Sequence, residues 1–286
     1  MTVPRTIIIS DAHGYPELIR NALKHSGFRA GDDVLVYAGD FVHRGPAADE
    51  CVSLVEGSGR LSASPLDPRP GDVVILWGNH DVAVLLGTFT YPNSPPADEL
   101  RPLFRERFTS GAWHLAACVG DVLVTHAGVS TEYAVDWEAC GHDRRWLATR
   151  LEGEFRNVIA YLLQAGTGVV NPPILGNLGP LGYRPSLESR DRLLPGLVQV
   201  VGHTPGGGVT ARSLRAAGMY MVDPDVLGGL RPEDSGRYRY AVIEDGLVRI
   251  EESASPASSP GSGLHAATSS EPASRGSDDS GVRVPT

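Results

Sequence analysis

Five short hydrophobic runs along the chain each stop at a polar motif. The runs cover residues 6–10, 34–38, 73–77, 122–125 and 198–201. Runs this short and this rich in Val and Ile are typical of strands that are buried on both faces of a sheet. We therefore expect five buried strands, each with polar side chains at its carboxyl end.

The segments that follow the first three runs predict helices near residues 17–25, 49–55 and 82–86. Alternating strands and helices predict parallel strands joined by right-handed crossovers. Further strands are expected at residues 219–222, 240–244 and 247–250, and the turn Asp245-Gly246 predicts that the last two form a hairpin. Two sheets packed face to face and flanked by helices would accommodate all of these elements.

Three other segments have a less regular pattern of apolar and polar residues. Residues 57–71 contain three prolines and are expected to form a loop. Residues 87–113 and 130–194 are expected to form a rim above the strand ends, with a helical patch at residues 99–108. Because loops on a rigid scaffold carry recognition, substrate specificity is expected to reside in this rim.

The polar motifs supply residue types that bind divalent metal ions. They are Asp11-Ala12-His13-Gly14, Gly39-Asp40-Phe41-Val42-His43-Arg44-Gly45, Gly78-Asn79-His80-Asp81, Thr125-His126-Ala127-Gly128 and Gly202-His203-Thr204. Open α/β sheets bind ligands at the carboxyl ends of their strands, so these side chains are expected to converge. Six or more such ligands are too many for one tetrahedral ion and suit a pair of ions.

The motifs resemble those of the calcineurin-like metallophosphoesterase superfamily, and within it the phosphoprotein phosphatase type. That pattern reads G-D-x-H-G, G-D-x-x-D-R-G, G-N-H-E, H-G/A-G and G-H. The stretch Gly179-Pro180-Leu181-Gly182-Tyr183-Arg184 also resembles the G-P-L-W-Y-R-G motif of the bacterial Shewanella-like branch. The resemblance implies an α/β fold, namely the α/β/β/α metallophosphoesterase sandwich of two mixed β-sheets flanked by helices.

The resemblance also implies a role for each motif residue. Two divalent ions are expected, the first held by Asp11, His13 and Asp40, and the second by Asp40, Asn79, His126 and His203. Manganese is the first choice, and Fe or Zn also suits this set of N and O ligands. His80 would be the general acid. Arg44 and Arg184 would clamp the phosphate, with Arg145 and Arg190 as rivals of Arg184.

Two positions depart from the family pattern. His43 stands where the family has an Asp that hydrogen-bonds the catalytic His, here His80. A neutral His43 can orient His80 but supplies no negative charge, so general acid catalysis is expected to be weakened unless Asp81 or a rim carboxylate compensates. Asp81 itself replaces the Glu of most phosphoprotein phosphatases.

The implied reaction is hydrolysis of a phosphate monoester by a hydroxide held between the two ions, with serine/threonine phosphoprotein-like specificity. One alternative is a symmetrical dinucleoside-tetraphosphate hydrolase or a small-metabolite phosphatase with the same metals. Another is a catalytically weakened metal-binding interaction module. Taken singly, Asp11 could cap a helix, Asn79 could occupy a turn and His126 could be an ordinary core histidine.

Composition narrows the possible partners. The chain has 286 residues, 41% of them hydrophobic, and a net charge of −9 with no basic run, so nucleic acid is not an expected partner. The expected partner is a phosphorylated protein or a small-molecule phosphate ester. No apolar run reaches membrane-spanning length. The three cysteines Cys51, Cys118 and Cys140 form no disulfide framework, and no signal peptide is expected before Asp11, so a cytoplasmic location is expected.

The end of the chain differs in kind from the rest. Residues 1–252 are expected to form the catalytic domain, whereas residues 253–286 are rich in Ser, Pro, Gly and Ala. A segment with so few large apolar residues buries too little surface to offset its ordering entropy, so it is expected to be disordered.

Removal of residues 253–286 should therefore leave both turnover and melting temperature unchanged. A chain ending at Glu252 can be compared with the full chain by calorimetry and by a phosphatase assay. A large loss of either property would show that the tail docks on the domain.

Overall fold

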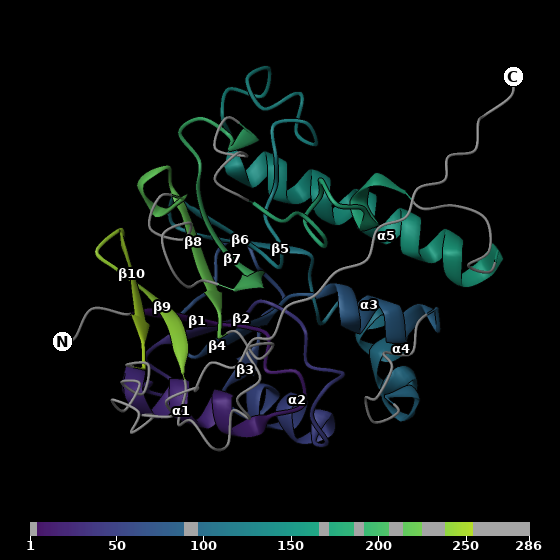
Figure 1. The fold of residues 1–286 in the computed structure, drawn as a ribbon, viewed down its shortest axis with the longest axis vertical. Helices are drawn as coiled ribbons and strands as arrows, with labels where there is room; N and C mark the ends of the chain where they lie inside the picture. Colours follow the sequence, from purple (N-terminus) through teal and green to yellow (C-terminus); the bar gives the residue numbers. More distant parts are fainter. Residues whose placement is uncertain are drawn as a thin grey trace, which may run out of the picture. The chain divides into compact units, whose positions relative to one another are not determined.

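The computed structural model describes residues 5–88, 97–165, 172–185, 192–205, 214–224 and 238–253. All of them belong to the compact unit Met1–Ser255. Of the tail predicted at residues 253–286, only Ser253 lies among the described residues, and Arg190 lies outside them. The described strands form two sheets (Figure 1).

The larger sheet has six strands in the order β10-β9-β1-β2-β4-β3. Their bounds are β1 Thr6–Ile9, β2 Val34–Tyr37, β3 Arg60–Leu61, β4 Asp72–Ile75, β9 Arg239–Glu244 and β10 Leu247–Glu252. Strands β1, β2 and β4 run parallel, and β9 pairs antiparallel with both β1 and β10. The expected parallel core and the C-terminal hairpin are both present.

The smaller sheet has four strands in the order β5-β6-β7-β8. Their bounds are β5 Ala116–Val119, β6 Val122–Thr125, β7 Val198–Pro205 and β8 Met219–Asp223. Strands β6, β7 and β8 are parallel, whereas β5 and β6 pair antiparallel. Both sheets are therefore mixed, as expected.

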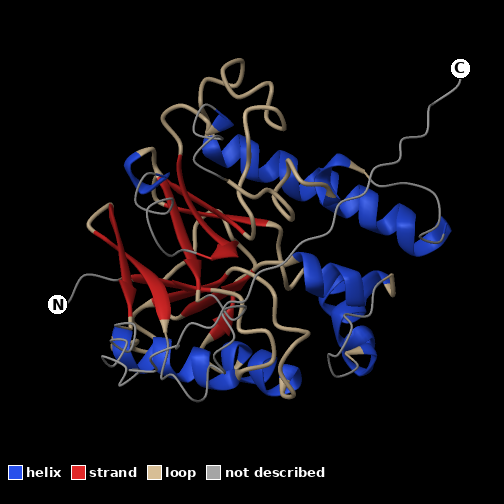
Figure 2. Cartoon of the chain, viewed as in Figure 1, coloured by secondary structure: helices blue, strands red, loops and turns tan. Residues whose placement is uncertain are grey.

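Helices flank the sheets (Figure 2). They are α1 Pro16–Ser26, α2 Ala48–Glu56, α3 Asn79–Leu86, α4 Arg101–Ser110 and α5 Arg144–Ala165, with short 3₁₀ helices at Asp98–Leu100 and Pro173–Leu175. Helices α1 and α2 lie along the six-stranded sheet, and α5 packs against β5 and β6 of the other sheet (Figure 1). None of the helices in the described ranges is long and apolar enough to span a membrane.

Alternate side chains of the strands enter two different apolar clusters. Ile7 and Ile9 of β1 belong to the cluster that includes the helices, whereas Ile8 belongs to a second cluster with Val124 and Val200 of the smaller sheet. Successive side chains of a strand point to opposite faces, so a strand covered on both faces is apolar throughout. This explains why the runs in the sequence are continuous rather than alternating.

Three features differ from the expected pattern. The long helix α5 occupies a stretch that was expected to be irregular, although its buried residues Leu147, Leu151 and Phe155 recur every four positions. The strand β3 lies within the expected loop at residues 57–71. Helix α3 begins at Asn79, one turn before the expected start, so that Asn79 lies in its first turn.

The buried side chain of Asp33 joins the segments that lead into β1 and β2. Its side chain is fully buried, and its carboxylate accepts hydrogen bonds from Nη2 of Arg29 at 2.6 Å and Nη2 of Arg5 at 2.9 Å. It also accepts the backbone N–H of Arg29 at 3.0 Å. Burial alone would raise the pKa of Asp33, but the hydrogen bonds from Arg29 and Arg5 outweigh it and hold the pKa well below its usual range.

The substitution Asp33→Asn should lower the free energy of unfolding by about 1–3 kcal/mol at neutral pH, because charged hydrogen bonds are lost at a buried position. The folded-state pKa lies below the unfolded value of about 3.9, so this contribution is complete above that pH and disappears as the pH falls further. Urea denaturation at pH 7 and near pH 3 should show a smaller difference between variant and wild type at the lower pH. An equal difference at both would contradict the assignment.

Candidate metal centre

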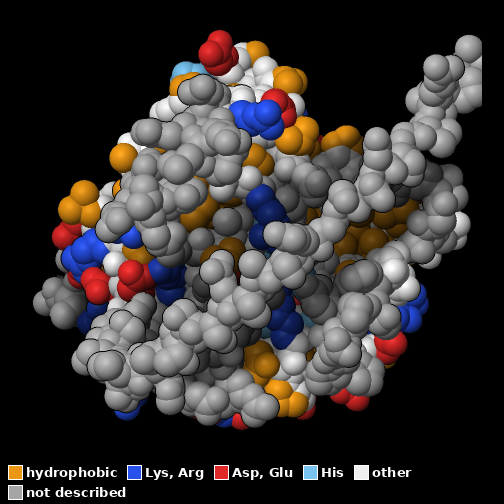
Figure 3. Space-filling model, viewed as in Figure 1, with side chains coloured by type: hydrophobic (Ala, Val, Ile, Leu, Met, Phe, Trp, Pro, Cys, Tyr) orange, Lys and Arg blue, Asp and Glu red, His pale blue; other side chains and the backbone are white. Residues whose placement is uncertain are grey.

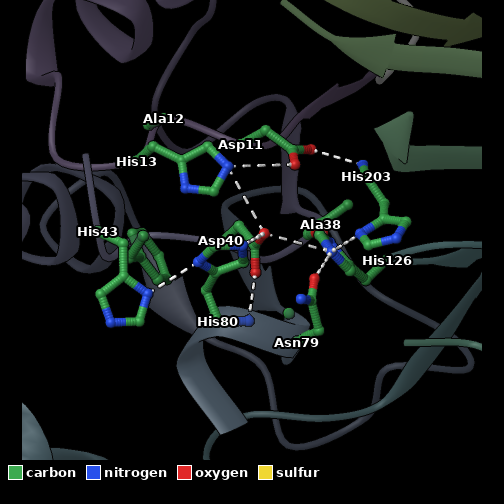
Figure 4. A network of polar contacts seen from close by, with 12 residues as sticks. Asp11, Ala12, His13, Ala38, Asp40, His43, Asn79, His80, His126 and His203 are labelled. Carbon is green, nitrogen blue, oxygen red and sulfur yellow. Dashed lines mark hydrogen bonds and ion pairs between the residues drawn. The ribbon is translucent and has the colours of Figure 1, made fainter. Parts of the chain in front are cut away.

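The five motifs come together at the carboxyl ends of five strands. The turns after β1, β2 and β4 bring Asp11, Asp40 and Asn79 from the larger sheet. From the smaller sheet come His126, directly after β6, and His203, which lies within β7 where its pairing with β8 is interrupted between Val201 and Pro205. Figure 4 shows the imidazole rings and carboxylates of this cluster turned toward one another. The expected convergence of the motif residues is present.

Asp40 lies at the middle of the cluster (Figure 4). Its Oδ2 is 3.6 Å from Nε2 of His13, 3.5 Å from Nε2 of His126 and 3.9 Å from Nε2 of His80. Its Oδ1 accepts the backbone N–H of His80 at 2.9 Å. One carboxylate oxygen is thus tied to helix α3, and the other faces donor atoms on both sides.

The first group of donor atoms surrounds His13. Asp11 Oδ1 lies 3.8 Å from Nε2 of His13, and Asp11 Oδ2 accepts the backbone N–H of His203 at 2.9 Å. Nδ1 of His13 lies 2.9 Å from the carbonyl oxygen of Val42. Because a carbonyl only accepts, Nδ1 carries the proton, and Nε2 presents its lone pair to Asp11 and Asp40.

The second group surrounds His126. Its Nε2 lies 2.9 Å from Oδ1 of Asn79 and 3.1 Å from Nδ1 of His203. Its Nδ1 lies 2.8 Å from the carbonyl oxygen of Ala38, which again leaves the lone pair on Nε2. Nitrogen and oxygen donors therefore crowd together with Asp40 at the centre.

Two sets of three side chains in the described part of the chain have spacing that would suit a metal ion. They are His13, Asp40 and His80, and Asp40, His126 and His203. Asp40 belongs to both sets. The first set contains His80 where the resemblance names Asp11, because Nε2 of His80 also faces Asp40. Such N and O donors suit Mn, Fe or Zn.

Burial controls the charge of these groups. It lowers the pKa of His13 to about 3 and of His203 to about 2, which keeps both rings in the neutral form that ligates metals. Burial, followed by the charges of Asp223 and Asp40, raises the pKa of Asp11 well above its usual value. A positive charge in the centre would stabilise the ionised form of Asp11, so the donor set fits divalent cations.

His43 contacts His80 directly. Their Nδ1 atoms are 2.8 Å apart, so one ring donates a hydrogen bond to the other, and Nε2 of His80 is left facing Asp40. Burial lowers the pKa of His43 to about 4, with His80 the next cause. Asp81 does not provide the carboxylate that the family has here, because both of its oxygens accept backbone N–H groups from Asp40, Phe41 and Gly78.

The two expected phosphate-binding arginines both lie near the centre, because the charges of both lower the pKa of His80 after burial, the largest cause. Arg184 donates from Nη1 to the carbonyl oxygen of His203 at 2.9 Å. The pKa of His13 is lowered first by burial and also by the charge of Arg44, which therefore lies near the first group. Arg145 instead donates to the carbonyl oxygen of Leu66. Figure 3 shows Lys and Arg atoms in the middle of the viewed face, among apolar side chains.

The remaining described histidines have local contacts outside these sets. Nε2 of the buried His114 lies 3.0 Å from the carbonyl oxygen of Ser62. His25 and His142 stack on aromatic rings.

Backbone conformation marks the site in a way that the sequence did not indicate. Six motif residues have φ between 48° and 72°, namely Asp11, His13, Asp40, His43, Arg44 and His203. Among the described residues other than glycine, only His142 and Asp245 share a positive φ. Such conformations cost roughly 1–3 kcal/mol each and concentrate at functional sites.

Sequence reasoning also missed Asp223. This buried residue ends β8 beside β7, and its charge contributes to the raised pKa of Asp11. The available signal was its position directly after the apolar residues of β8, the same placement that identified the motifs.

Known proteins similar to the chain include two named as symmetrical bis(5'-nucleosyl)-tetraphosphatases. The one from Vibrio parahaemolyticus is 26% identical over 155 residues, which are 52% of this chain and 53% of that protein. The one from Citrobacter koseri is 36% identical over 100 residues, 34% of this chain and 31% of that protein. The chain thus spans about half the length of the first relative and less of the second.

A solved structure of a cold-active protein-tyrosine phosphatase from a psychrophilic Shewanella species has a TM-score of 0.59 at 18% identity, covering 88% of this chain and 80% of that one. At this identity the likeness shows a common fold. The family model described as calcineurin-like phosphoesterase matches residues 4–207, a span that contains all five motifs. The chain therefore belongs to the calcineurin-like phosphoesterase family.

Proposed function

We propose that the chain is a metal-dependent phosphatase that hydrolyses phosphate esters at this centre. The observation that carries the proposal is the single carboxylate of Asp40, whose Oδ2 lies 3.6 Å from Nε2 of His13 and 3.5 Å from Nε2 of His126. One oxygen between two groups of ligands is the arrangement that a pair of ions requires. Family membership supports the same reaction class.

In this proposal Asp11, His13 and Asp40 hold the first ion. The second is held by Asp40, Asn79, His126 and His203. When bound, the ions supply Lewis acidity and a nucleophilic water near neutral pH. Manganese is the proposed metal, since the mixed N and O donors accept it, and Fe or Zn would also fit.

The other side chains of the site act on the substrate. Arg44 and Arg184 are proposed to bind phosphate oxygens, because the planar guanidinium matches their geometry. His80 is proposed to protonate the leaving group from Nε2, and His43 holds the ring through the 2.8 Å contact between Nδ1 atoms. Asp11 is preferred to His80 as a ligand of the first ion, because His80 is then available for this role.

We propose a phosphorylated protein of the serine/threonine type as the first substrate class, in a cytoplasmic location. A symmetrical dinucleoside-tetraphosphate hydrolase is the second candidate, and it is favoured by the two tetraphosphatases that resemble this chain. Release of phosphate from phosphoserine peptides, compared with cleavage of diadenosine tetraphosphate in the presence of added Mn²⁺, distinguishes the two substrate classes.

An interaction module without catalysis is less well supported, because the ligand atoms still converge and His80 still faces them.

The ligand assignment is tested by comparing Asp40→Asn with His80→Gln. Loss of a residue that only orients a metal ligand costs about 10–100-fold in metal affinity or activity, so loss of the shared ligand in Asp40→Asn should cost more than ~100-fold and reduce metal content. His80→Gln should lose about 10²–10⁴-fold in turnover while the metal content stays at two ions per chain. Elemental analysis with steady-state kinetics measures both. If His80→Gln loses an ion and Asp11→Asn keeps both, the assignment of Asp11 and His80 must be exchanged.

The role of His43 is tested by His43→Asp, which restores the carboxylate of the family. A carboxylate beside Nδ1 should favour the protonated form of His80 and raise turnover at neutral pH. The gain should be larger for alkyl phosphates than for p-nitrophenyl phosphate, whose leaving group scarcely needs a proton. General acid catalysis is worth about 10²–10⁴-fold, so a partial gain is measurable. Slower turnover for every leaving group would instead show that His43 itself serves the reaction.

A further inference from the structure

The turns after β2 and β4, which carry Asp40 and Asn79, touch backbone to backbone. A Cβ atom added to Gly39 would lie 2.6 Å from the Cα atom of Gly78. One added to Gly78 would lie 2.1 Å from Oδ1 of Asp40. Both positions therefore require glycine, and the spacing of the two turns is set by direct contact.

Asp81 joins these two turns with its side chain. The residue is fully buried, and its Oδ2 accepts the backbone N–H of Asp40 at 2.8 Å and that of Gly78 at 3.1 Å. Its Oδ1 accepts the backbone N–H of Phe41 at 2.9 Å. All three partners are donors, so the position needs two acceptor oxygens.

The side chain of Asp40 in turn accepts a hydrogen bond from the backbone of the turn after β4. Its Oδ1 accepts the backbone N–H of His80 from the first turn of α3. Asp40 and Asp81 thus exchange hydrogen bonds, each carboxylate binding backbone of the other's segment. Because Asp40 has a φ of 63°, a conformation that side-chain-bearing residues rarely adopt, its backbone needs such support.

We propose that Asp81 is the positioning residue that fixes the direction of the Asp40 carboxylate and so holds the two groups of metal ligands in register. The inference rests on the proposed two-metal centre. With Asp81 in place, Oδ1 of Asp40 is committed to α3, and only Oδ2 is left to face His13 and His126. A role as charge partner of His80 is not compatible with this geometry, because both Asp81 oxygens bind backbone.

The test is Mn²⁺ binding to Asp81→Asn in the full chain. The amide keeps the shape of the side chain but has one acceptor, so its NH₂ group must face at least one backbone N–H. Mn²⁺ affinity at the shared site should fall by about 10–100-fold, the range found for residues that orient a ligand. Calorimetric titration gives the affinity, and the electron paramagnetic resonance spectrum should lose the coupling expected of a Mn²⁺ pair. Both are measured well below the melting temperature.

Asp33→Asn is the matched control. It also replaces a fully buried carboxylate that accepts backbone and side-chain hydrogen bonds, but it lies at the start of β2, away from the strand ends that carry the ligands. It should lower the melting temperature without changing Mn²⁺ affinity or coupling. If Asp81→Asn behaves in the same way, Asp81 is only structural and the inference is overturned.

If Asp81→Asn does not fold, the positioning role of Asp81 is tested with Asp81→Glu. It keeps both acceptor oxygens, so it should bind two Mn²⁺ ions within about tenfold of the wild-type affinity. Loss of the coupled pair in Asp81→Glu would contradict the inference. Failure of the wild-type chain to bind a pair would instead contradict the proposed metal centre, so the two failures are distinguishable.

Discussion

The position of one buried carboxylate oxygen, Oδ2 of Asp40, governs how the rest of the site is built. It faces Nε2 atoms of two histidines, His13 from the larger sheet and His126 from the smaller one. A buried carboxylate is costly unless positive charge or hydrogen bonds compensate for it. The backbone N–H of His80 compensates for one oxygen of Asp40, and a cation in the centre would compensate for the other.

The two-sheet fold is suited to holding such a group. Five strands that contribute to the apolar clusters lead to the centre, so each ligand lies in a buried strand or within a few residues of its end. The left-handed φ of Asp11, Asp40 and His203 is then maintained by hydrogen bonds and close glycine contacts. The apolar core therefore supports strain at the ligand-bearing turns, which is a common relation between stability and function.

The sequence predicted the buried strands and the meeting of the ligand-bearing turns, because both depend on a local pattern of apolar and polar residues. Apolar runs followed by polar residues indicated both the strands and the edge at which the ligands meet. Pairwise geometry could not be obtained in this way. The contact between His43 and His80, and the hydrogen bonds between Asp81 and the turn of Asp40, join residues about forty positions apart through side-chain orientations that no local pattern encodes. Helix α5 did have a visible four-residue repeat, which the surrounding charged residues obscured.

The most direct test of the two-metal account is anomalous diffraction from crystals of the full chain grown with Mn²⁺. Two anomalous peaks about 3.5–4 Å apart are expected. The carboxylate of Asp40 should lie between them, with Asp11 and His13 on one peak and His126 and His203 on the other. A single peak, or a pair of peaks that Asp40 does not touch, would contradict it.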